Sequence, residues 1–112
     1  MSKPFEIVKG DTRPYHQETL KIGGSVVDLT GASVVYELKS ETGELIIESA
    51  ATVSDAANGV VQYQWQATDW DNVNFVAGWY RARWRVTYAD STQQSFPTRT
   101  YDRVIVRESL VV

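Results

Sequence analysis

Cysteine is absent from this sequence of 112 residues, and histidine occurs once. The lack of cysteine excludes disulfides, thiolate zinc sites and thiol nucleophiles together. The single histidine, His16, excludes metal sites built from several imidazoles and leaves one candidate for a Ser-His-Asp arrangement. The chain also lacks a Gly-x-Ser-x-Gly nucleophile elbow. We therefore expect a protein that is not an enzyme, with no cofactor and no metal.

Long apolar runs are missing as well. No window approaches the ~18 apolar residues of a membrane span, and residues 1–8 do not resemble a signal peptide. Positive charge is also scarce, because 11 Lys and Arg stand against 14 Asp and Glu, for a net charge of −3. Nucleic-acid binding depends on clustered positive charge. We expect no membrane insertion and no nucleic-acid partner.

Aromatic and aliphatic residues are plentiful. Hydrophobic residues make up 43% of the chain, and four Trp, six Tyr and three Phe are among the aromatic and aliphatic side chains available for a core. This composition is that of a folded globular protein, and the length suits one domain. We find no internal repeat or linker, so residues 1–112 are expected to form a single domain.

The clearest local pattern lies in residues 78–90, where two kinds of side chain alternate strictly. Successive side chains of a strand point to opposite faces, so this stretch predicts one long strand with an apolar and a basic face. The apolar face is expected to be core, and it comprises Tyr80, Ala82, Trp84, Val86 and Tyr88. The opposite face comprises Trp79, Arg81, Arg83, Arg85 and Thr87.

Shorter runs of the same kind occur along the rest of the chain, separated by Gly, Asn, Asp and Pro. The second of them, residues 15–22, is polar for a core strand, so it should either have one solvated face or lie at an edge, with Leu20 and Ile22 pointing inward. Residues 67–77 break the pattern and predict a loop or a single helical turn. About seven to eight short strands without a long helix indicate an antiparallel β-sandwich. The predicted strands are residues 5–9, 15–22, 33–40, 44–53, 61–65, 78–90 and 93–107.

Five local motifs occur in an order and at spacings that match a known family. They are Gly10-Asp11-Thr12 and the segments 27–32, 55–65, 78–82 and 96–98. With them the chain resembles the small immunoglobulin-like domains of tailed bacteriophages, typified by the N-terminal domain of the phage baseplate upper protein. The resemblance extends from about residue 6 to residue 106 and implies an immunoglobulin-like β-sandwich.

The resemblance also implies a function. It predicts a non-enzymatic structural or adaptor protein of a tail, baseplate or related virion component of a phage or prophage. Such a protein would assemble in the bacterial host cytoplasm and become part of the virion, where it would contact other phage structural proteins, with a homo-oligomer as a further option. The alternative is a carbohydrate-binding module that recognises a host-surface polysaccharide through exposed Trp70 and Trp79.

Two further patterns have plain structural explanations. We expect His16 to be an exposed structural histidine in a polar strand. The oxygen-bearing side chains of residues 69–74 superficially resemble a calcium loop, but the turn glycine and the distal glutamate are missing. Residues that cap a loop are the favoured interpretation there.

The basic face of residues 78–90 is the strongest candidate for a partner surface. One interpretation is a solvated sheet face on which the arginines pair with Glu37 and other acids of neighbouring strands. The other is that it docks on an acidic neighbour through bidentate Arg–carboxylate contacts. Trp and Arg are enriched at the centres of interfaces, so the candidate interface residues are Trp70, Trp79, Arg81, Arg83 and Arg85.

Overall fold

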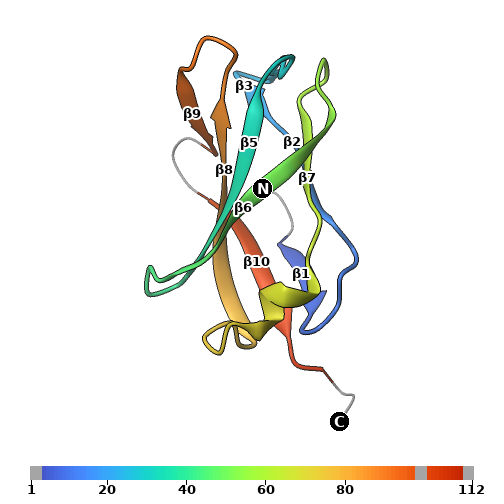
Figure 1. The fold of residues 1–112 in the computed structure, drawn as a ribbon, viewed down its shortest axis with the longest axis vertical. Coiled ribbons are helices and arrows are strands. Elements are labelled where there is room, and N and C mark those ends of the chain that lie inside the picture. Colours follow the sequence, from blue (N-terminus) through green and yellow to red (C-terminus); the bar gives the residue numbers. More distant parts are fainter. Residues whose placement is uncertain (1–3, 98–100, 110–112) are drawn as a thin grey trace.

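The computed structural model describes residues 4–97 and 101–109 and has an all-β fold (Figure 1). One short 3₁₀ helix, η1 (Ala67–Asp71), occupies the segment where the strand pattern breaks. The predicted β-sandwich class is confirmed. The strands are β1 Phe5–Val8, β2 His16–Thr19, β3 Lys21–Ile22, β4 Ser25–Val26, β5 Ser33–Ser40, β6 Leu45–Asp55, β7 Val60–Tyr63, β8 Gly78–Thr87, β9 Gln93–Phe96 and β10 Asp102–Arg107.

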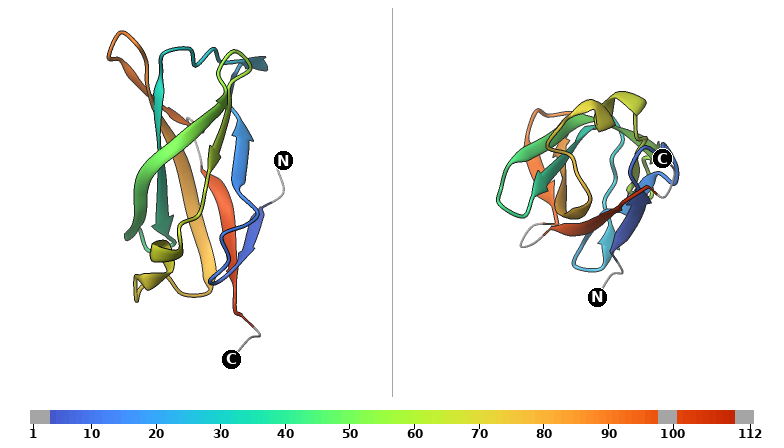
Figure 2. Two further views of the ribbon diagram at one scale, coloured as in Figure 1. Left: turned by 45° about the vertical axis from the view of Figure 1, so that its right-hand side comes forward. Right: turned by 90° about the horizontal axis from the view of Figure 1, so that it is seen from below.

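The strands follow the order β1-β10-β8-β5-β6-β7-β2 and wrap around a common interior (Figure 2). β6 connects the two layers, because its first half pairs with β5 and its second half with β7. The sequence predicted an antiparallel sandwich, but β1 pairs with β10 in parallel. The two ends of the path meet where the rings of Phe5 and His16 stack, with 4.6 Å between centroids.

Much of the interior is formed by side chains from alternate positions of β5, β7 and β8. In the β5–β8 register Tyr36 lies opposite Trp84, and the two rings are 4.7 Å apart. The predicted inward residues of the 78–90 run are buried, apart from Tyr88, which is half-buried just beyond the end of β8. Tyr63 stacks on Tyr36 at 4.5 Å, and Trp65 contacts both rings. Because side chains alternate along each strand, these aromatic residues point to the same side of the sheet and contact one another in the core.

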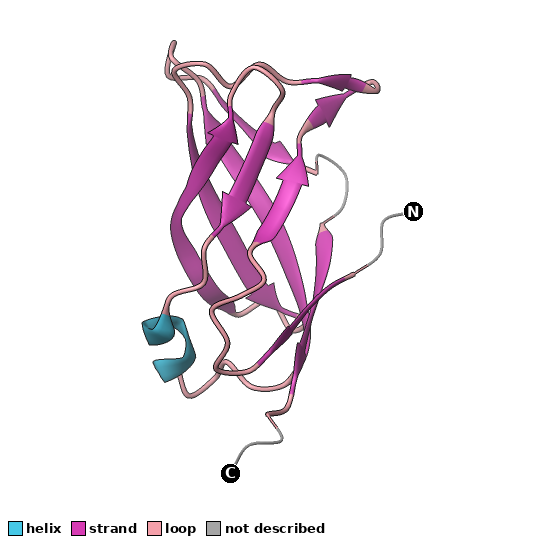
Figure 3. Cartoon of the chain, turned by 90° about the vertical axis from the view of Figure 1, so that its right-hand side faces the viewer, coloured by secondary structure: helices cyan, strands magenta, loops and turns pink. Residues whose placement is uncertain are grey.

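The predicted strand 15–22 is divided at Leu20. Leu20 is buried as expected, but its amide donates to the Gly59 carbonyl and its carbonyl accepts from Val27, so the chain turns away from β7. The following residues pair in the small β3–β4 hairpin seen apart from the main sheet in Figure 3. Ile22 is 53% exposed there, and its predicted inward position was wrong.

The predicted strands 78–90 and 93–107 differ from the structure at their ends and at Pro97. β8 ends at Thr87, and Pro97 divides the later run into two strands that pair with different halves of β8. β9 lies beside the second half of β8, and β10 lies beside the first half. Proline has no backbone donor, which explains a break at this position. Thr98, part of one family motif, lies outside the described residues.

Gly59 offers a direct test of this packing. Its φ is +70°, and a Cβ there would come within 2.7 Å of the Val27 carbonyl oxygen and 2.9 Å of that of Leu20. Gly59→Ala should lower the free energy of unfolding by about 3 kcal/mol, since it adds a backbone clash to left-handed strain. Gly43→Ala is the matched control: its φ is +94° with nothing nearby, so it should cost about 1 kcal/mol. Urea unfolding measures both, and equal losses would contradict the packing.

Candidate functional site

His16 is buried, with 2% of its surface exposed, so the predicted exposed histidine was wrong. β2 lies at one end of the strand path, but Phe5 of β1 covers its inner side by stacking on the imidazole. The edge of the ring also faces Trp84, with 5.2 Å between centroids. β2, whose polar sequence suggested a solvated strand, therefore contributes a titratable group to the core.

Both nitrogens of this imidazole face polar atoms. Nδ1 lies 2.8 Å from the Tyr36 hydroxyl, a hydrogen-bond distance. Nε2 lies 3.8 Å from Glu18 Oε1 and 4.0 Å from Asp102 Oδ2. The three ligand atoms all lie within 4.8 Å of one another. We call His16, Glu18 and Asp102 the seam cluster, because they lie between β2 and β10, which do not pair with each other.

The alternation of two strands brings these side chains together. Glu18 is two residues after His16 on β2 and shares its face. Asp102 opens β10 on the same face as the buried Val104, and its Oδ2 accepts a hydrogen bond of 3.1 Å from Trp84 Nε1. The sequence held a signal that could have identified the cluster, since both acids occupy inward positions of their strands.

The surroundings of Asp102 disfavour the ionised form of its carboxyl group. Burial, followed by the charge of Glu18, raises the pKa of Asp102 from 3.8 to about 6, although the Trp84 indole and His16 act in the opposite direction. Burial also raises the pKa of Tyr36 well above 10, so its hydroxyl stays protonated at His16. The cluster therefore holds two crowded carboxylates beside one imidazole nitrogen, and a cation would relieve their repulsion.

The predicted interface residues do not form one site. Arg85 lies 2.8 Å from Glu37 and 3.5 Å from Glu48 on the outer sheet face, as the ion-pair interpretation expected. Arg81 instead covers the ring of Tyr101, and Arg83 lies with it beside a surface cavity. Trp79 is 40% exposed on the same face, and Arg103 covers its ring at 4.2 Å.

Trp70 is not the free aromatic surface that the sequence suggested. It lies on η1, where it stacks on Phe75 at 4.5 Å and on Trp65 at 5.9 Å. Its indole N–H donates to the Asp11 carbonyl at 2.9 Å. Trp70 is thus half-buried and packs against one end of the core.

The oxygen atoms of the apparent calcium loop have other partners. Asp69 accepts hydrogen bonds from the Tyr63 hydroxyl at 2.6 Å and from the Gln66 amide at 2.9 Å. The Asn72 side chain accepts from the Asn74 amide, and the Asn74 side chain donates to Glu44. These contacts confirm the loop-capping interpretation.

The pKa of Asp102 predicts how stability varies with pH. Between pH 3.8 and about 6 the folded state keeps a proton that the unfolded state loses, so the free energy of unfolding should fall as pH rises through this range. Asp102→Asn should flatten this slope by on the order of 1 kcal/mol. Urea unfolding at pH 5 and pH 7 measures it, with Asp71→Asn as a loop control. Equal slopes in wild type and Asp102→Asn would contradict it.

Comparisons with known proteins bear on the fold. No family model matches the chain, and no curated protein matches it. A solved structure, CopC from Methylosinus trichosporium OB3b, matches with a TM-score of 0.50 and 15% identity, over 99% of this chain and 90% of that one. This likeness supports the β-sandwich fold. Among the described residues, no helix is long and apolar enough to cross a membrane.

The comparisons correct the predicted function. The solved structure described above is a CopC and not a component of a phage particle. The predicted role as a structural or adaptor protein of a tailed phage is therefore wrong. The resemblance to phage immunoglobulin-like domains stays a prediction drawn from sequence motifs, because no family model matches the chain.

Proposed function

We propose that this protein binds a divalent transition-metal cation through His16, Glu18 and Asp102. The observation that carries the proposal is a buried imidazole whose Nε2 faces two inward-pointing carboxylates at 3.8 and 4.0 Å. The proposed role is binding rather than catalysis. The support comes from the side chains of this chain, since the likeness to CopC concerns the fold.

The spacing of the ligand atoms suits a cation. A metal bound at about 2.0–2.2 Å to each ligand keeps any two ligands no more than about 4.4 Å apart. Both distances from Nε2 meet this limit, and the two carboxylate oxygens lie within 4.8 Å of each other, close to it. Metal-free ligands with this spacing require little rearrangement on binding.

Tyr36 prepares His16 for such a role. A ligating imidazole usually holds its second nitrogen in a hydrogen bond that fixes the ring orientation. Here the Tyr36 hydroxyl contacts Nδ1 and leaves Nε2 toward the carboxylates. Stacking on Phe5 and edge contact with Trp84 hold the ring from two further sides.

The exposure of the cluster allows a cation to enter. The imidazole side chain is 3% exposed, whereas the side chains of Glu18 and Asp102 are 31% and 19% exposed. The carboxylates therefore lie toward solvent, where water can complete the coordination. One nitrogen and two oxygen ligands suit Zn²⁺, Cu²⁺ or Ni²⁺ better than Mg²⁺ or Ca²⁺, which prefer oxygen alone.

Titration of the full chain with CuSO₄, NiCl₂ or ZnCl₂ tests the proposal. We expect one saturable site, tightest for Cu²⁺, with stabilisation of about 2.7 kcal/mol at a hundredfold excess over Kd. Trp84 fluorescence should change in parallel, because its indole is bonded to Asp102. MgCl₂ at the same concentration should have little effect.

Substitutions locate the cation. His16→Gln should abolish saturable binding, and Glu18→Gln and Tyr36→Phe should weaken it by about 10- to 100-fold. Glu6→Gln is the control, because Glu6 is an exposed carboxylate paired with Arg107 outside the cluster. Circular dichroism checks that each variant is folded. If His16→Gln does not fold, Glu18→Gln is the variant that tests the site. No saturable binding, or binding unchanged in Glu18→Gln, would refute the site.

A further inference from the structure

Three cations lie side by side across the outer face of the sheet. Lys39 of β5 is in register with Arg81 of β8, and Arg81 is in register with Arg103 of β10. All three side chains are exposed. Neighbouring strands are about 4.8 Å apart, so the three positions span roughly 10 Å. We call these three residues the basic row.

Such a row is unfavourable by itself. Like charges directly opposite each other on adjacent strands destabilise a sheet. Within residues 4–97 and 101–109, no ion pair joins Lys39, Arg81 or Arg103 to a carboxylate, although the whole chain carries 14 Asp and Glu. The nearest acid of β5, Glu37, is bonded to Arg85 instead.

Aromatic rings hold both guanidinium groups of the row. Arg81 lies over the ring of Tyr101 at 4.8 Å, and Arg103 lies over that of Trp79 at 4.2 Å. Stacking fixes the plane of a guanidinium and leaves the N–H groups at its edge able to donate. These arginines are therefore already ordered for bidentate contacts with an oxyanion.

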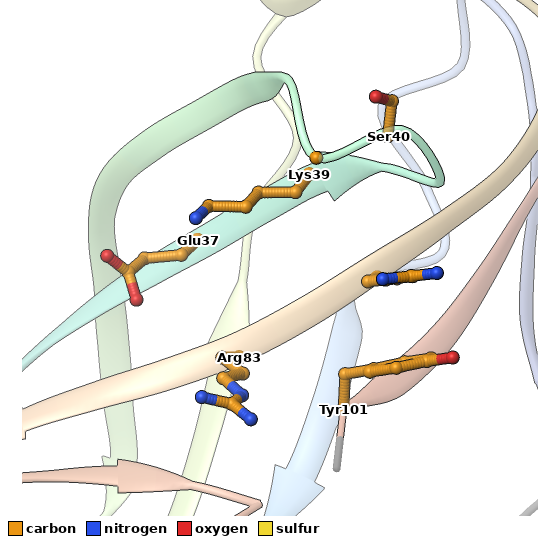
Figure 4. Close-up of a pocket in the computed structure, with 7 residues that line it drawn as sticks. Glu37, Lys39, Ser40, Arg83 and Tyr101 are labelled. Atoms are coloured by element: carbon orange, nitrogen blue, oxygen red, sulfur yellow. The ribbon is translucent and has the colours of Figure 1, made fainter.

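A cavity of about 230 Å³ opens beside the row, and Figure 4 shows Lys39, Arg83, Glu37 and Tyr101 around it. Its lining also includes Arg81, Ser40 at the end of β5 and Gly43 in the β5–β6 turn. Three of its seven lining residues are cationic and one is acidic. The volume suits a small ligand rather than a polymer.

We infer that the basic row and this cavity form a binding site for a small molecule with two oxyanion groups, phosphate or carboxylate. Two such groups about one strand spacing apart would each contact neighbouring cations of the row. Binding would also remove the repulsion within the row. This site lies on the outer face of β8, whereas the seam cluster lies inside, so the two proposals stand independently.

Pyrophosphate and succinate are the probes, and they separate phosphate from carboxylate chemistry. We expect saturable binding of at least one of them by calorimetry, together with a rise in melting temperature at constant ionic strength set with NaCl. Arg81→Gln should weaken that binding at least tenfold. Arg107→Gln is the control, because Arg107 is an exposed arginine paired with Glu6 away from the cavity.

Lys39→Gln distinguishes a specific site from general screening of surface charge by the probe, because it should weaken probe binding without destabilising the free protein. It should leave the free protein as stable or more stable, since it removes one like charge from the row, while it weakens probe binding. If neither probe binds, or if the binding survives in Arg81→Gln and Lys39→Gln, the inference is overturned.

Discussion

The burial of the His16 imidazole constrains the rest of this structure. The ring closes the sandwich, because its stacking on Phe5 joins the two ends of the strand path. A polar ring inside an aromatic core is costly unless both nitrogens find partners. Tyr36 meets Nδ1, and the space beside Nε2 is occupied by Glu18 and Asp102. Burial of the imidazole therefore both closes the sandwich and places two carboxylates next to Nε2.

β8 connects this interior to the opposite surface. Its inward residue Trp84 donates to Asp102, and its outward residue Arg81 stacks on Tyr101. Because side chains alternate along a strand, β8 contacts the seam cluster through Trp84 on its inner face and contributes Arg81 to the basic row on its outer face. This separation explains how a chain with a net charge of −3 still has a cationic face.

Sequence reasoning succeeded where a side chain's role depends on its own strand. The bounds of β5 were predicted as observed, and so was the burial of the inward residues of β8, with Tyr88 just beyond its end half-buried. It failed where the role depends on a distant segment. His16 seemed exposed because its own neighbours are polar, and its cover, Phe5, belongs to another strand. Ile22 seemed buried because nothing local showed that the chain leaves β7 after Thr19.

The order of residues alone was sufficient for the all-β class, the strand faces and the two-sided character of β8, because these follow from a period of two. Tertiary structure decided which strands are neighbours. Glu18 and Asp102, like Lys39 and Arg103, are more than 60 residues apart in the chain, and each pair is brought together by strands that do not pair directly with each other. Alternation says which way a side chain points, but long-range register alone decides what it meets there.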